Sequence, residues 1–204
     1  MPPDRALLVR RGLQLTWATA AYNSLEAVLS IVAGLLAGSV ALVGFGLDSV
    51  IELASAGAGI WRLRSDASPH DRERVERLAL RAIGICFLLL AAYVLVDAVL
   101  TLLSRRAPTA SRLGIAIAIG SLIVMPLLAR AKRRVAAQLK SQALTAEARQ
   151  TQLCTYLSAV LLGGLLLNAT LSWWWADPLA ALVMVPLIAY EGVEALRGRT
   201  VCCD

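Results

Sequence analysis

Aromatic, histidine and cysteine residues are scarce in this chain of 204 residues. Aromatic side chains make up 5% of it, there is one histidine, and the four cysteines form no CxxC pair. No cysteine spacing predicts a disulfide framework. The sequence also lacks a GxxxxGK[ST] loop, an internal repeat and a long linker, so we expect no P-loop nucleotide site and one domain over residues 1–204.

Apolar residues, in contrast, are abundant. They form 58% of the chain, and its mean hydropathy is +0.69. A soluble domain is typically about 45–50% apolar, and one small core cannot hide the excess. Ala, Leu, Val, Ile and Gly supply most of it, which is typical of helices packed closely in lipid. The composition therefore predicts an integral membrane protein.

Six apolar runs predict six membrane-spanning helices, because a span needs about 20 residues. The first run is too long for a signal peptide and is followed by further spans. The predicted fold is an all-α membrane protein, a six-transmembrane-helix bundle. The predicted helices cover residues 13–36, 40–60, 78–103, 113–129, 146–171 and 178–196.

The positive charge lies between the apolar runs. A net charge of +6 would suggest nucleic-acid binding in a soluble protein, but here it more simply fixes topology, and we expect no nucleic-acid partner. With a cytoplasmic N-terminus, 17 of the 20 basic residues face the cytoplasm. Arg105, Arg106 and Arg112 remain outside. The positive-inside rule thus predicts that both termini are cytoplasmic.

Two acidic residues lie within the second predicted span. Asp48 and Glu52 are four residues apart, so both carboxyl groups share one face of the helix. Like charges in lipid need a cation, protons or a basic partner, and the sequence predicts no Arg or Lys at that depth. Two interpretations stay open: a cation site, or protonated carboxyl groups hydrogen-bonded between helices.

The fifth predicted span begins with a second polar face. Glu147, Gln150 and Cys154 follow i, i+3, i+7 spacing, and a carboxylate, an amide oxygen and a thiolate are all possible metal ligands. Two helices, each giving a pair of side chains one turn apart, could surround one ion. The alternative for Cys154 is the role of a small buried apolar residue.

Other polar residues suggest a pathway and a loop site. The first span carries a stripe that lines a pathway or bonds to neighbouring helices, and Glu147 is a further pathway candidate. The stripe consists of Thr19, Asn23, Glu26 and Ser30. Asp66, His70 and Asp71 form either a secondary metal site in a loop or a solvated loop. An enzyme would need a nucleophile beside a base, and the single histidine lies in this loop. We therefore expect that the protein is not an enzyme.

Three stretches of the sequence resemble the cation diffusion facilitator (cation efflux) family. The stretch 38–52, with Asp48 and Glu52, resembles its second helix, and 141–154 resembles its fifth helix. The stretch 176–181 resembles the entry to its sixth helix. The resemblance implies a homodimer that exports divalent cations by proton-coupled alternating access. Two lysines against eighteen arginines fit a GC-rich bacterial genome, so we expect the bacterial cytoplasmic (inner) membrane. Small residues on the third span, such as Gly84 and Ala91, are compatible with an interface between two copies.

The resemblance assigns the transported ion to Asp48, Glu52, Gln150 and Cys154, with no permanently bound cofactor. The family has His and Asp where this chain has Gln150 and Cys154, and its C-terminal cytoplasmic domain is not expected here. A thiolate favours zinc or cadmium, and the amide oxygen favours iron, manganese or cobalt; we take zinc as the first expectation. The alternative is a non-transporting membrane metal sensor or partner subunit of the same fold.

The orientation can be tested directly. A reporter fused after Asp204 should be active only in the cytoplasm, because the opposite orientation would place 17 of the 20 basic residues outside. A fusion after Arg106, between the third and fourth predicted spans, serves as the control and should report the outer side. Periplasmic activity of the C-terminal fusion would contradict the helix order.

Overall fold

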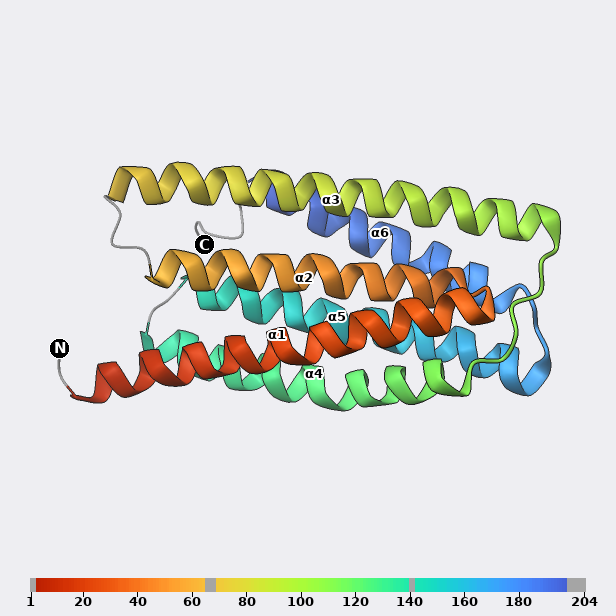
Figure 1. The fold of residues 1–204 in the computed structure, drawn as a ribbon, viewed down its shortest axis with the longest axis horizontal. Helices are drawn as coiled ribbons and strands as arrows, with labels where there is room; N and C mark the ends of the chain where they lie inside the picture. Colours follow the sequence, from red (N-terminus) through yellow and green to blue (C-terminus); the bar gives the residue numbers. More distant parts are fainter. Residues whose placement is uncertain (1–2, 65–68, 140–141, 198–204) are drawn as a thin grey trace.

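The computed structural model describes residues 3–64, 69–139 and 142–197 (Figure 1). In this part of the chain it contains six α-helices and no strand, as the sequence predicts. Each helix is long and apolar enough to cross a membrane. The helices are α1 (Pro3–Ala37), α2 (Val40–Arg64), α3 (Pro69–Ser104), α4 (Arg112–Leu139), α5 (Gln142–Leu171) and α6 (Ala176–Leu196).

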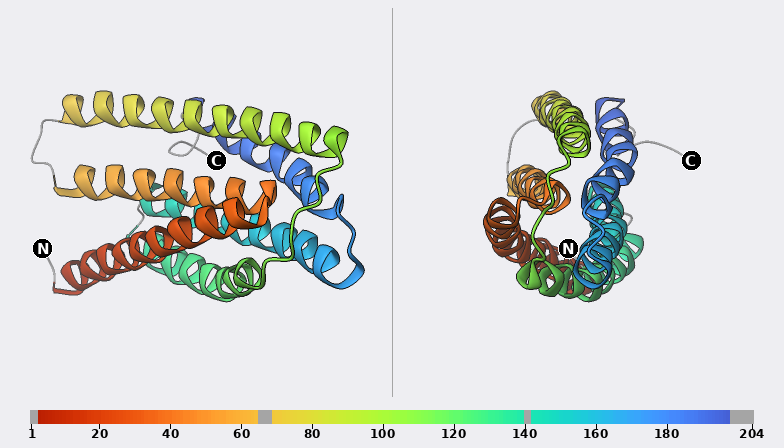
Figure 2. Two further views of the ribbon diagram at one scale, coloured as in Figure 1. Left: turned by 45° about the vertical axis from the view of Figure 1, so that its right-hand side comes forward. Right: turned by 90° about the vertical axis from the view of Figure 1, so that its right-hand side faces the viewer.

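Successive helices run in opposite directions along one elongated bundle (Figure 1). Round the bundle their order is α1, α2, α3, α6, α5 and α4, and neighbours in this ring contact each other (Figure 2). Helix α2 also contacts α5 and α6 across the bundle, and residues 39–46 at its start are all buried. Side chains on the α2 face toward α5 and α6 are therefore shielded by several helices.

The outer surface of the bundle is apolar. Large aliphatic side chains such as Leu36, Leu89 and Leu127 are exposed there, while Phe45 and Met125 are completely buried between helices. Exposed aliphatic side chains along every helix are unfavourable in water and favourable in lipid. This distribution agrees with the integral membrane protein that the composition predicts.

Several helices extend beyond the predicted spans. Helix α4 continues to Leu139 rather than ending at residue 129, and α3 begins at Pro69 rather than at residue 78. The prediction stopped where the apolar run stopped, but an amphipathic helix can continue past the hydrocarbon with polar side chains on its outer face. The extra turns of α4 carry Lys132 into the bundle, and this changes the candidate site described below.

The turn between α1 and α2 is tied to the start of α6. Gly38 has φ of +65°, a left-handed conformation that glycine adopts without steric penalty. Ser39 caps α2, since its Oγ accepts a hydrogen bond from the Leu42 amide at 3.1 Å. Ser39 Oγ donates to the buried Asp177 carboxylate, which also accepts from the Val40 amide at 3.0 Å. Asp177 therefore fixes the start of α2 against α6.

Helices α3 and α6 approach closely at two glycines. A Cβ on Gly84 would lie 2.8 Å from the Gly192 carbonyl oxygen, and one on Gly192 would lie 3.0 Å from the Gly84 carbonyl oxygen. Gly84 and Ala91 are both buried within the chain. These small residues therefore pack helices of one chain together. The expectation that they lie on a face open to a second copy was wrong.

This close approach predicts unequal effects of two glycine substitutions. Gly84→Ala should destabilise the fold by about 1–3 kcal/mol because its methyl group meets backbone atoms. Gly163→Ala is the matched control, since a Cβ there meets nothing within 4 Å, and it should be neutral or slightly stabilising. Thermal unfolding in detergent measures both, and equal midpoints for the two variants would contradict the packing of α3 on α6.

Candidate metal site

Two carboxyl groups and one thiol meet inside the bundle. Asp48 and Glu52 on α2 are 4% and 5% exposed, and Cys154 on α5 is 1% exposed. One ligand atom from each of these side chains lies within 4.8 Å of the other two. With a small inward movement of these side chains, a single ion could contact all three atoms, because metal–oxygen and metal–sulfur bonds to zinc are about 2.0–2.3 Å long.

Helix geometry and packing explain this meeting. Asp48 and Glu52 are one turn apart and therefore share a face of α2, and α2 contacts α5 there. A small cavity of about 10 Å³ borders the three side chains and is also lined by Gln150 and Glu191. This volume is close to the least that holds one water molecule. The cavity is thus of the size of a small ion and not of an organic substrate.

Gln150 borders the site, but its amide oxygen has another partner. The Ser55 hydroxyl of α2 donates a hydrogen bond to Gln150 Oε1 at 3.1 Å. Gln150 lines the cavity beside Asp48 and Cys154 and also a second cavity beside Glu52. The structure therefore brings all four predicted ligands together, with three of them in ligand-like proximity.

The polar stripe of α1 contacts the same group. Asn23 Nδ2 donates to Glu52 Oε2 at 2.7 Å, and Ser49 Oγ donates to Glu26 Oε2 at 2.9 Å. Cys154 Sγ lies 3.9 Å from the same Glu26 oxygen. The stripe thus faces the bundle interior, and its Asn23 donates a hydrogen bond to one carboxyl group of α2.

Three buried acceptors of this stripe have no hydrogen-bond partner among the described residues. They are Asn23 Oδ1, Glu26 Oε1 and Ser30 Oγ. Buried polar atoms are nearly always hydrogen-bonded, because an unpaired one costs about 1–3 kcal/mol. Their position on successive turns of α1 leaves a row of free oxygen atoms beside the acidic pair, suited to a water molecule or a passing cation.

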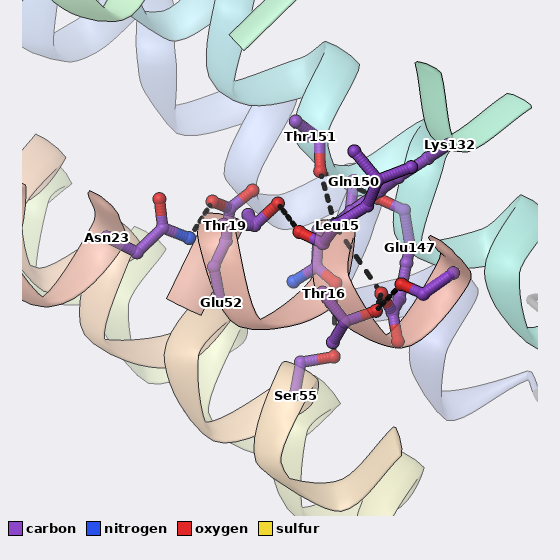
Figure 3. Close-up of polar contacts among 11 residues, drawn as sticks. Leu15, Thr16, Thr19, Asn23, Glu52, Ser55, Lys132, Glu147, Gln150 and Thr151 are labelled. Atoms are coloured by element: carbon purple, nitrogen blue, oxygen red, sulfur yellow. Dashed lines mark hydrogen bonds and ion pairs between the residues drawn. The ribbon is translucent and has the colours of Figure 1, made fainter. Parts of the chain in front are cut away.

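A buried lysine lies near Glu52, and both residues line one small cavity. Lys132 of α4 is 1% exposed, and its Nζ is 3.4 Å from Glu147 Oε2 and 3.4 Å from Thr151 Oγ1. Thr16 of α1 donates to the same Glu147 oxygen at 2.9 Å. Figure 3 draws these side chains in one view with Asn23 and Glu52. The expectation of no Arg or Lys at this depth was wrong, because it ended α4 before Lys132.

Other sequence expectations have different outcomes. Glu191 of α6, which the sequence analysis does not single out, lines the cavity beside Asp48. Asp66 lies outside the described residues. His70 and Asp71 belong to α3 rather than to a loop, and their side chains are not among those the structure describes. The secondary metal site at Asp66, His70 and Asp71 therefore stays a prediction, and two of its three residues lie on α3.

Comparison with known proteins gives a matching family and relatives that include two curated proteins. A family model described as the cation efflux transmembrane domain matches residues 16–199. An uncharacterized transporter of Synechocystis sp., sll1263, is 30% identical over 168 residues, which are 79% of this chain and 54% of that protein. Transmembrane protein 163 of Xenopus laevis is 27% identical over 135 residues, which are 66% of this chain and 48% of that protein. The chain thus spans about half the length of these curated relatives.

Proposed function

The chain belongs to the cation efflux family, and from this premise we propose that it exports divalent metal cations from the cytoplasm. The family consists of transporters rather than enzymes. One observation of the site carries the proposal: ligand atoms of the buried Asp48, Glu52 and Cys154 lie within 4.8 Å of one another. Oxygen and sulfur atoms in this arrangement, inside a membrane-spanning bundle, suit a transition-metal ion.

Charge balance supports the same proposal. Two carboxylates buried side by side repel each other strongly where the surroundings are apolar. A divalent cation neutralises both, and a thiolate from Cys154 adds a third negative ligand. Gln150 completes a set of four, when its amide oxygen turns from Ser55 to the ion. A tetrahedral set of this kind fits zinc.

The donor atoms rank the possible cargo ions. A thiolate favours zinc and cadmium over harder ions. Two carboxylates and an amide oxygen are harder ligands that also accept iron, manganese or cobalt. We propose zinc first, because it accepts both oxygen and sulfur ligands and tolerates four-coordination without a preferred d-electron geometry.

Proton exchange follows from the chemistry of the ligands. Carboxyl groups and a thiol bind a metal only after losing their protons, so binding releases protons and an emptied site takes them up. Alternating access would expose the site first to the cytoplasm and then to the outside, with protons returning. The three free acceptors of α1, at Asn23, Glu26 and Ser30, support a route along α1. Glu147 would lie on the other side of the site.

The setting of this cycle is also part of the proposal. We place the protein in a bacterial cytoplasmic membrane, and we propose a homodimer because the family resemblance implies one. The contact between Gly84 and Gly192 occupies the small residues that suggested a dimer face. A second copy would therefore use other, lipid-facing side chains of the bundle.

Cys154 gives a direct test of the site. Zinc or cadmium should slow maleimide labelling of Cys154 about tenfold or more at saturation, because a metal-bound thiolate is a poor nucleophile. The measurement uses a variant in which the other three cysteines are serine, followed by mass spectrometry. Asp48→Asn should abolish both the protection and the metal uptake by inverted vesicles, and Asp97→Asn on α3 is the control, because Asp97 is not one of the clustered ligands.

Two results would contradict the proposal. The first is labelling that is indifferent to every divalent metal, together with normal transport by Asp48→Asn. The second is metal protection of Cys154 with no transport by the wild-type protein in sealed vesicles, which would favour the non-transporting sensor instead. Correct folding of each variant is checked by its elution as a single species in detergent.

A further inference from the structure

A single buried ammonium group lies near the acidic pair. Among the described residues, Lys132 is the basic residue with a fully buried side chain. Its Nζ is 3.4 Å from Glu147 Oε2, and the exposed fractions of the two side chains are 2% and 14%. A buried charge is unfavourable without a partner. One carboxylate balances this ammonium, but it does not explain why a lysine stands beside a cation site.

Lys132 and the metal ligands share a cavity. This second cavity, of about 10 Å³, is lined by both Lys132 and Glu52, together with Asn23, Glu147, Gln150 and Thr151. Glu52 is at the same time one of the three clustered ligands. Apart from Ala56, every residue that lines this cavity is polar or charged, and Lys132 and Glu52 both border it.

The lysine side chain has the reach and freedom to use this space. Its four-carbon stem is flexible and its ammonium has three donors that can change partners without a fixed geometry. The hydrogen bond from Nζ to Thr151 Oγ1 is long, at 3.4 Å, like the contact to Glu147. Neither contact has the 2.7–2.9 Å length of a strong charge-assisted hydrogen bond. The ammonium is held on Glu147 without being locked there.

We propose that Lys132 is a tethered cation that competes with the transported metal for Glu52. When a metal occupies the site, its charge repels the ammonium, which stays on Glu147. When the metal leaves, the ammonium moves across the shared cavity to Glu52 and stabilises the emptied site. This inference rests on the proposed function and adds a device that lowers metal affinity enough for release. Glu147 then acts as the resting place of Lys132.

The device predicts opposite effects for its two members. Lys132→Gln removes the competitor, so zinc or cadmium should bind on the order of tenfold tighter, because a nearby positive charge opposes a cation in a partly buried site. Glu147→Gln removes the resting place, leaves the ammonium on Glu52 and should weaken binding. The double variant should resemble Lys132→Gln, because Glu147 acts only through the lysine. Lys132→Arg, which keeps the charge, should stay nearer the wild type.

The measurement is equilibrium dialysis of zinc and, separately, cadmium against purified protein in detergent at one pH. Arg133→Gln, an exposed neighbour on α4, is the matched control and should bind like the wild type. A purely structural ion pair would make Lys132→Gln and Glu147→Gln weaken binding alike, and that result would overturn the inference. Unchanged affinity in Glu147→Gln, which keeps every proposed ligand, would overturn it as well, even if Lys132→Gln failed to fold.

Failure of the proposed function gives a different pattern. If the wild type and all variants bind neither metal, the site itself is wrong and this inference falls with it. If the wild type binds metal and both single variants change the metal affinity in the same direction, the site stands and only the role of Lys132 is refuted. Tighter binding by Lys132→Gln combined with weaker binding by Glu147→Gln supports the tethered cation.

Discussion

The repulsion between Asp48 and Glu52 is the constraint on which the rest of the structure depends. Both carboxyl groups are buried on one face of α2, where like charges cannot be solvated by water. The surrounding helices supply the compensation: an amide donor from Asn23, a thiol from Cys154 and, across a small cavity, the ammonium of Lys132. A divalent cation would satisfy the same constraint more completely than any of these, and this is the physical basis of the proposed metal site.

The fold holds α2 in the position that this site requires. Helix α2 contacts α1, α3, α5 and α6, and its first turn is bonded to Asp177 at the start of α6. The acidic face therefore meets α5 at Cys154 and α1 at Asn23, so three helices contribute to one small region. In an alternating-access cycle, a shift of α2 relative to α5 would change the distances among the ligands directly.

Much of this arrangement could be predicted from the sequence. Six apolar runs of membrane length gave the six helices, and spacing alone placed Asp48 and Glu52 on one face and Gln150 and Cys154 on another. The partners of these faces could not be predicted in the same way, because periodicity says which residues share a face but not which helix covers it. Lys132 was missed since apolar runs mark the hydrocarbon and not the end of a helix. Gly84 was expected at an interface between two copies, because small residues suit close helix contacts of either kind, but it packs against Gly192 of the same chain.

The central claim is that Asp48, Glu52 and Cys154 bind one divalent cation together. X-ray absorption at the zinc edge tests it most directly, on protein whose other three cysteines are serine. The account predicts one sulfur neighbour at about 2.3 Å and oxygen or nitrogen neighbours at about 2.0–2.2 Å, with the sulfur signal lost in Cys154→Ser and zinc binding lost in Asp48→Asn. A spectrum without sulfur, or one unchanged by Asp48→Asn, would contradict the account.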